Sequence, residues 1–162
     1  MGDITLQLDQ QHAPLTVANF LRYTREKHFD GTLIYRVVPG LLIQGGSWDG
    51  PAHARPVHKP IPLEAGLKNV RGAIAMARGE PDSATAEFFI DIVDVPSLDH
   101  QASDTGNTTG FAVFGNVVAG MDVVDTIGKV PVGDNGPVKG QAPVDPIRIL
   151  NVQVLPGTAP AP

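Results

Sequence analysis

The sequence predicts a mostly β fold, a closed β-barrel with helices covering its ends. Three observations support this class. Glycine (18 residues) and proline (15 residues) are frequent in the 162-residue chain, which is typical of short strands joined by many turns. Seven short segments have strand-like apolar patterns, whereas two have the apolar spacing of a helix. A hydrophobic share of 42% is sufficient for one sizeable core, so we expect a single domain over residues 1–155.

The strand segments either alternate apolar and polar residues or form short apolar runs that end at turns. Residues 4–8 (ITLQL) show the alternation of a half-buried strand. The seven predicted strands span residues 4–8, 33–38, 41–44, 73–77, 88–92, 111–114 and 147–155. Because neighbouring strand residues point to opposite faces, only one of the adjacent rings Phe88 and Phe89 can face a binding cleft.

Two segments have apolar residues at helical spacing. The first follows Pro14, a residue favoured in the first turn of a helix, and Gly31 lies beyond its end. Its expected buried face comprises Val17, Phe20, Leu21 and Thr24. Its expected exposed face comprises Asn19, Arg22, Arg25 and Glu26. The second helix is predicted over residues 121–127 and ends at Gly128, a typical C-terminal stop.

The remaining segments are predicted to be loops. The longest covers residues 47–69 and is rich in glycine, proline and histidine. Loops of this length are usually functional or ordered by packing on the domain. Residues 156–162 form a tail rich in proline and alanine, which we expect to be disordered.

The composition also excludes several classes of function. The formal net charge is −5 and no cluster of lysine and arginine offsets it, so we expect no nucleic-acid partner. No apolar run reaches the roughly 18 residues of a membrane span, so we expect no membrane partner. The chain has no cysteine, which excludes disulfides and thiol catalysis. His53 and His58 have no partner at metal-ligand spacing, and we expect neither a metal nor another cofactor.

The N-terminus has no signal-peptide pattern, so a cytoplasmic location is expected, with the periplasm as the alternative if the native N-terminus is longer. No segment suggests an oligomer interface, and we expect a monomer.

The most informative stretch is residues 35–46 (YRVVPGLLIQGG), in which Arg36 interrupts an apolar strand. A guanidinium in such a run is costly to bury unless it is hydrogen-bonded. Gln44 lies on the strand after the Pro39-Gly40 turn and can accept that bond. This arrangement indicates an arginine held rigidly at the floor of an apolar cleft, which suits a reaction that needs a fixed hydrogen-bond donor.

Several motifs in order along the chain resemble those of the cyclophilins, the peptidyl-prolyl cis-trans isomerases, particularly the compact bacterial type. They are APLTVANF at 13–20, YRVVPGLLIQGG at 35–46, RGAIAMAR at 71–78, SATAEFFI at 83–90 and FGNVVAGMDVV at 114–124. The resemblance covers nearly the whole chain and implies an eight-stranded antiparallel barrel capped by two helices. Because only Met1 precedes the Gly2-Asp3-Ile4 pattern, we expect the first strand to be shortened.

The resemblance also implies roles for individual residues. Arg36 takes the position of the catalytic arginine, and Gln44 orients it. Ala77 and Arg78 are expected to offer backbone groups to an extended substrate. The expected walls of the proline pocket are Leu41, Leu42, Met76, Phe89, Leu98 and Phe111. For Met76, however, plain core packing is the simpler interpretation.

The implied activity is isomerisation of X-Pro bonds, which assists protein folding, in proline-containing peptides and in unfolded or flexible protein segments. The residues that depart from the usual family pattern are Tyr35, Leu41, Glu87, Ser97 and Phe111. The lack of an aromatic ring at Ser97 predicts only weak ciclosporin binding. Glu87, a substrate-site position by resemblance, is expected across the cleft from Arg36, whose charge would lower the Glu87 pKa. The alternative is a proline-peptide-binding module with low or no isomerase turnover.

Overall fold

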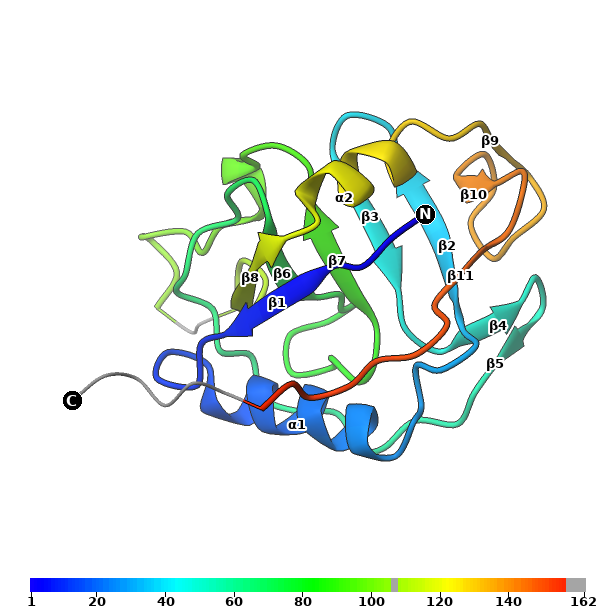
Figure 1. Cartoon of the computed structure of the whole chain (residues 1–162). Coiled ribbons are helices and arrows are strands. Elements are labelled where there is room, and N and C mark those ends of the chain that lie inside the picture. The colour runs from blue at the N-terminus through cyan, green and yellow to red at the C-terminus, as the bar shows by residue number, and fades with distance from the viewer. Residues whose placement is uncertain (106–107, 157–162) are drawn as a thin grey trace.

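A curled antiparallel sheet of seven strands forms the body of the protein in the computed structural model, which describes residues 1–105 and 108–156 (Figure 1). The strands follow one another across the sheet in the order β1, β8, β6, β7, β3, β2 and β11. Their bounds in that order are Thr5–Leu8, Val113–Ala119, Ala73–Met76, Phe88–Asp91, Leu42–Gly45, Leu33–Val38 and Ile147–Arg148. The fold is therefore mostly β, as the sequence predicts.

The expected closed barrel of eight strands is not confirmed. Within the described residues, the edge strands β1 and β11 are not paired with each other, so the sheet stays open as a half-barrel. The predicted C-terminal strand is short, Ile147–Arg148, and the chain after it bonds to the segment before β2. Gly31 N–H donates to the Ile149 carbonyl at 2.7 Å, and Ile149 N–H donates to the Thr32 carbonyl at 2.8 Å.

Four short strands and a short 3-10 helix lie outside the main sheet and were not predicted. β4 (Trp48–Gly50) pairs with β5 (His53–Ala54), and β9 (Val132–Gly133) pairs with β10 (Ala142–Pro143). The 3-10 helix covers Pro96–Leu98. Strands of two or three residues are too short to show an alternating pattern. The segment 47–69, assigned to a loop from its sequence, therefore contains one hairpin.

Helices α1 (Pro14–Arg25) and α2 (Met121–Ile127) lie at opposite ends of the sheet (Figure 1). The first turn of α1 has no side-chain cap of its own, and Glu64 from the long loop supplies one. Its carboxylate accepts the backbone N–H groups of Leu15 and Thr16 at 3.1 and 2.8 Å. The negative charge of a carboxylate at this end of the helix also interacts favourably with the helix dipole. Glu64 thus connects the long loop to α1, and this part of the loop is ordered by packing on the domain.

One residue of α1 was assigned to the wrong face. Asn19 is 8% exposed, and its side-chain amide donates to the Thr85 carbonyl at 2.7 Å. Its polar side chain suggested solvent exposure, but a hydrogen bond to a partner far along the chain allows its burial.

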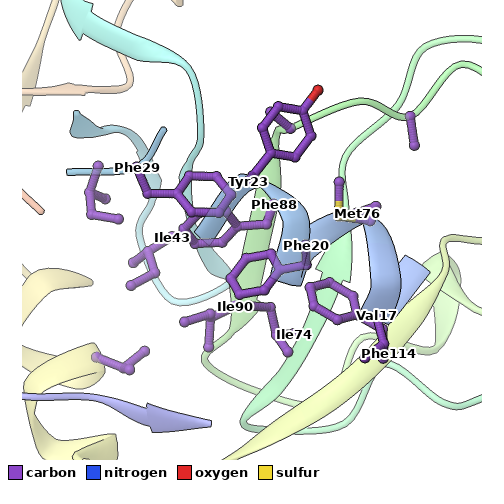
Figure 2. Packing of buried hydrophobic residues seen from close by; sticks show 14 of the residues in the cluster. Val17, Phe20, Tyr23, Phe29, Ile43, Ile74, Met76, Phe88, Ile90 and Phe114 are labelled. Atoms are coloured by element: carbon purple, nitrogen blue, oxygen red, sulfur yellow. The ribbon is translucent and has the colours of Figure 1, made fainter. Parts of the chain in front are cut away.

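The central strands send alternate side chains to two faces of the sheet. On the first face, Val37 pairs with Ile43, Ile43 with Ile90, and Ile90 with Ile74. Residues paired directly across strands share a face. Together with side chains of α1, these residues form the main core, in which Phe20 packs against neighbouring rings (Figure 2). Phe88 belongs to this core, and its ring lies 5.7 Å from that of Phe20 in edge-to-face geometry.

The remaining boundaries differ modestly from expectation. β8 begins at Val113 instead of residue 111 and extends to Ala119. The predicted tail falls at residues 156–162, of which 157–162 lie outside the described residues. No helix in the described ranges is long and apolar enough to cross a membrane.

Candidate active site

The second face of the sheet carries Arg36 and its neighbours in one row across five strands. Arg36 on β2 pairs with Gln44 on β3, Gln44 with Phe89 on β7, Phe89 with Ala75 on β6, and Ala75 with Val113 on β8. Because cross-strand partners share a face, these five side chains lie on the face opposite the main core. We call it the site face. Phe89 therefore points to the site and Phe88 to the core, as predicted.

A tight turn joins the two strands that carry Arg36 and Gln44. The Leu41 N–H donates to the Val38 carbonyl at 3.0 Å, and Gly40 between them has a φ of 73°. Proline followed by a residue with positive φ is typical of a type II turn, and glycine adopts that conformation without steric cost. The turn fixes the register of β2 on β3 and so brings Arg36 opposite Gln44.

Two glutamines hold the guanidinium of Arg36. Its Nη1 donates to Gln44 Oε1 at 2.9 Å, which is the contact that the sequence predicts. Its Nε donates to Gln141 Oε1 at 2.5 Å. An arginine has five N–H donors, and within the described residues neither hydrogen of Nη2 is bonded. The side chain is thus fixed while one end remains able to donate to a ligand.

Gln141 is a site residue that the sequence does not predict. It lies just before β10, and its backbone carbonyl accepts the Val37 N–H at 2.8 Å. That backbone contact brings the Gln141 side chain to Arg36. No local pattern marks this residue, because the contact depends on how a distant segment docks on β2.

A second apolar cluster covers the site face. Its buried members are Leu42, Ala73, Ala75, Phe89 and Val113. Its partly buried members are Val38, Leu41, Leu67, Ala77, Leu98 and Phe111. We call these residues the site cluster. All the apolar residues that the resemblance places in the proline pocket belong to it except Met76. Met76 is 1% exposed and belongs to the main core (Figure 2), so it is not placed to line a pocket on the site face.

Phe111 is held between a ring and a cation. Its ring lies 5.4 Å from the ring of Phe89 in edge-to-face geometry, and the Arg78 guanidinium lies 5.0 Å above its centroid. Arg78 also donates to the Gly110 carbonyl from Nη2 at 2.6 Å. Both contacts tie the loop before β8 to the segment that follows β6. Arg78 therefore supports one wall of the site with its side chain.

The backbone of Ala77 and Arg78 is only partly free. The Ala77 N–H donates to the Glu87 carbonyl at 2.9 Å. In the described part of the chain, the backbone N–H and carbonyl of Arg78 form no hydrogen bond. Of these two residues, Arg78 is the one whose backbone N–H can pair with an extended peptide.

Glu87 lies in a different environment from the one expected. Its Oε1 accepts the Ser47 N–H at 2.7 Å, and within the described residues it forms no ion pair with Arg36. Burial raises the pKa of Glu87, and the hydrogen bond from the Ser47 N–H opposes this rise only in part. The prediction that the guanidinium lowers this pKa was wrong, because desolvation of the carboxylate outweighs its favourable contacts.

A shallow pocket of about 240 Å³ adjoins the row on the site face. The residues that line it are Gln44, Ala77, Arg78, Gly79, Ser83, Thr85 and Glu87. Four of the predicted site residues thus border one hollow, next to the site cluster. Ser97, in the 3-10 helix, is exposed, so its side chain does not close the wall beside Leu98.

Comparisons with known proteins agree with this architecture. The family model described as cyclophilin type peptidyl-prolyl cis-trans isomerase/CLD matches residues 1–154. Peptidyl-prolyl cis-trans isomerase A of Dickeya dadantii is 41% identical over 157 residues, which are 95% of this chain and 80% of the relative. Peptidyl-prolyl cis-trans isomerase B of Escherichia coli K12 is 42% identical over 156 residues, 94% of each chain.

A solved structure is similar in fold. The cyclophilin type peptidyl-prolyl cis-trans isomerase of Cryptosporidium parvum, crystallised in the presence of the dipeptide Ala-Pro, has a TM-score of 0.77. The superposition covers 96% of this chain and 94% of that chain at 22% sequence identity.

Proposed function

This chain belongs to the family of cyclophilin-type peptidyl-prolyl cis-trans isomerases, and we propose that it isomerises X-Pro bonds with Arg36 as its catalytic hydrogen-bond donor. The observation that supports this role most strongly is the fixation of the guanidinium by two glutamines beside an apolar cluster. The substrates are proline-containing peptides and unfolded or flexible segments of proteins.

The reaction requires little beyond a well-placed donor. Planarity of the peptide bond gives rotation a barrier of about 18–20 kcal/mol, and an uncatalysed X-Pro bond exchanges in roughly 10–100 s. A typical turnover of about 10 s⁻¹ needs roughly a 10²–10³-fold acceleration, or about 3–4 kcal/mol. One hydrogen bond to a charged group contributes roughly 1.5–3 kcal/mol. A single arginine and an apolar pocket therefore account for most of the required stabilisation.

The geometry suits a donor that acts only near the transition state. When the amide twists, its nitrogen recovers a lone pair that the planar form lacks. The unpaired Nη2 of Arg36 can donate to this nitrogen, and the bond strengthens as the twist develops. Since the two glutamines already fix the guanidinium, little reorganisation accompanies the step. The site cluster, with Phe89 and Phe111 in contact, supplies apolar walls for the proline ring.

The alternative function is a proline-peptide-binding module with low turnover. Leu41 and Ser97 favour it, because with these residues the walls of the site have fewer aromatic rings than the usual family pattern provides. The dipeptide Ala-Pro, present with the similar Cryptosporidium protein, is a suitable minimal probe. Binding of an Ala-Pro peptide without accelerated exchange between its two isomers would favour this alternative.

The test is exchange spectroscopy by NMR on an Ala-Pro peptide. We expect Arg36→Ala to lower kcat/KM by at least about tenfold, which is the loss of about 1.4 kcal/mol of transition-state stabilisation. Arg25→Ala, at an exposed arginine in the last turn of α1, is the matched control and should retain full activity. Retained activity in a folded Arg36→Ala protein would exclude the catalytic assignment.

Two finer properties belong to the same proposal. We infer weak ciclosporin binding, because Ser97 and Leu41 lack the rings that would shape the walls of the site. We also infer a monomer, since no segment of the sequence marks an interface between copies. Sedimentation or light scattering tests the second inference directly.

A further inference from the structure

A chain of buried polar groups continues from Arg36 through Gln44 to Tyr35. Gln44 accepts from Arg36 through Oε1, and its Nε2 donates to the Tyr35 hydroxyl at 2.5 Å. Gln44 is 8% exposed and Tyr35 is 6% exposed. Buried polar groups of this kind need partners for every donor and acceptor. The chain must therefore end on a group that can accept a proton.

The strand register explains why Tyr35 can reach Gln44. Pairing between β2 and β3 shifts by one residue between Ile34 and Arg36, and Tyr35 is the extra residue. Such a bulge changes the direction of the side chain at this position. Tyr35 is thereby placed beside Gln44, with its ring 5.9 Å from the ring of Trp48.

The direction of every hydrogen bond in this chain follows from Arg36. A guanidinium only donates, so Gln44 must present its oxygen to Arg36 and its amide NH₂ to Tyr35. Tyr35 must then accept with its oxygen, which leaves the phenolic proton to be donated elsewhere. If that proton pointed back to Gln44, the amide would turn over and present NH₂ to the guanidinium.

Glu87 provides a matching acceptor. Its Oε1 is occupied by the Ser47 N–H, whereas its Oε2 is buried and has no hydrogen-bond partner in the described structure. Glu87 and Gln44, the partner of Tyr35, line the same pocket. Burial, and then the charge of the Glu87 carboxylate, raises the pKa of the Tyr35 hydroxyl. Gly46 makes room for the carboxylate, since a Cβ there would lie 2.5 Å from Oε2.

We propose that Tyr35 and Glu87 are positioning residues, in which the phenolic proton is donated to Glu87 Oε2 and the carboxylate thereby fixes the orientation of the Gln44 amide that holds Arg36. The proposal rests on the isomerase function proposed above. It gives Glu87 the role of orienting Gln44, in place of the role of a competitor with the substrate for Arg36. A carboxylate can present one oxygen to the Ser47 N–H and the other to the Tyr35 hydroxyl, whereas a neutral amide has an acceptor oxygen on one side only.

The test combines two single variants and their double variant. We expect Tyr35→Phe and Glu87→Gln each to lower kcat/KM by roughly three- to tenfold, mainly through kcat, because Arg36 is positioned less well for the transition state. In the Glu87→Gln variant the single amide oxygen would serve either the Ser47 N–H or the Tyr35 hydroxyl. Because both variants interrupt the same chain of hydrogen bonds, kcat/KM of the double variant should be no lower than that of the less active single variant.

The control and the second readout separate positioning from stability. Tyr23 is the matched control, since it is also buried and its hydroxyl accepts the His58 N–H at 2.8 Å outside this chain. Tyr23→Phe should keep full activity. NMR of the free protein should show shifted Gln44 side-chain amide resonances in Glu87→Gln and unshifted ones in Tyr23→Phe.

Distinct results would overturn the proposal. The first is a loss of kcat/KM in the double variant that equals the product of the two single losses. The second is an increase of kcat/KM in Glu87→Gln, and the third is unshifted Gln44 amide resonances in that variant. If the unmodified protein itself fails to accelerate X-Pro exchange, the proposed function fails, whereas the amide resonances still test the chain of hydrogen bonds.

Discussion

Arg36 and Gln141 are in direct contact although they are 105 positions apart in the sequence. The Arg36 Nε donates to the Gln141 side-chain oxygen at 2.5 Å, and the Gln141 backbone accepts from Val37, the residue next to Arg36. The segment before β10 thus anchors the arginine by its main chain and its side chain together. Docking of this peripheral segment is therefore coupled to the geometry of the site.

Gln141→Ala should reduce activity without unfolding the protein. A half-buried hydrogen bond to a charged group is lost, and the guanidinium keeps only its bond to Gln44. We expect kcat/KM to fall by roughly three- to tenfold, or about 1 kcal/mol, with most of the change in kcat. The measurement is NMR exchange on an Ala-Pro peptide. Gln10→Ala, at an exposed glutamine, is the control, and equal activity of the two variants would show that Gln141 does not position Arg36.

Alanine substitutions at Phe88 and Phe89 should have different main effects, on stability for Phe88 and on activity for Phe89. The Phe88 ring lies in the main core, 5.6 Å from the ring of Phe29, whereas Phe89 contacts Phe111 on the site face. Phe88→Ala should lower the free energy of unfolding by roughly 3–5 kcal/mol. Phe89→Ala should cost less stability and more kcat/KM. Urea unfolding and exchange spectroscopy on both proteins provide the comparison, and Phe88→Leu serves if the alanine variant does not fold. The reverse pattern would contradict the strand register.

The sequence was sufficient for those features that depend on local pattern. Alternation located the central strands and correctly divided Phe88 from Phe89, and the turn at Pro39-Gly40 placed Gln44 opposite Arg36. Resemblance to the cyclophilins added five apolar members of the site cluster, which are Leu41, Leu42, Phe89, Leu98 and Phe111. Met76 shows the limit of this reasoning, since a family motif does not state to which face each of its residues points.

Features that depend on packing between distant segments of the chain could not be predicted from the sequence. Gln141 has no local pattern, and the strands next to it are two residues long. The raised pKa of Glu87 depends on how deeply β7 and the residues around Ser47 enclose its carboxylate. The bonds between the C-terminal segment and residues 30–32 likewise join parts of the chain that are far apart in the sequence.

Ser97→Trp should strengthen ciclosporin binding. Ser97 is exposed in the 3-10 helix beside Leu98, a member of the site cluster. An indole at this position would add an apolar wall and an N–H donor. We expect calorimetry to give an affinity for the variant at least about tenfold tighter than for the unmodified protein, or about 1.4 kcal/mol. Ser97→Ala is the control and should change little. Nanomolar affinity of the unmodified protein would contradict the role assigned to the missing ring.

Asp91 should make the stability of the fold depend on pH. It pairs with Leu42 across β3 and β7, so it points to the site face, and it is 0% exposed. In the described structure neither of its carboxylate oxygens has a hydrogen-bond partner. Burial and then the charge of Asp99 raise the pKa of Asp91 from 3.8 to about 7. Lys68, which forms an ion pair with Asp99 at 3.5 Å, is the nearby cation.

The sign of the effect follows from the raised pKa. Between about pH 4 and pH 7 the folded protein binds a proton at Asp91 that the unfolded chain has released, so stability falls as the pH rises through this range. Asp91→Asn removes the ionisation, and we expect its free energy of unfolding to exceed that of the unmodified protein by up to roughly 4 kcal/mol above about pH 7. The difference should nearly vanish below about pH 3, where the carboxyl is protonated in both states. Urea unfolding across this range measures it, with the exposed Asp134→Asn as the control. A constant difference between Asp91→Asn and the unmodified protein at every pH would show that Asp91 is already ionised in the folded protein at low pH, and that the site face tolerates its charge.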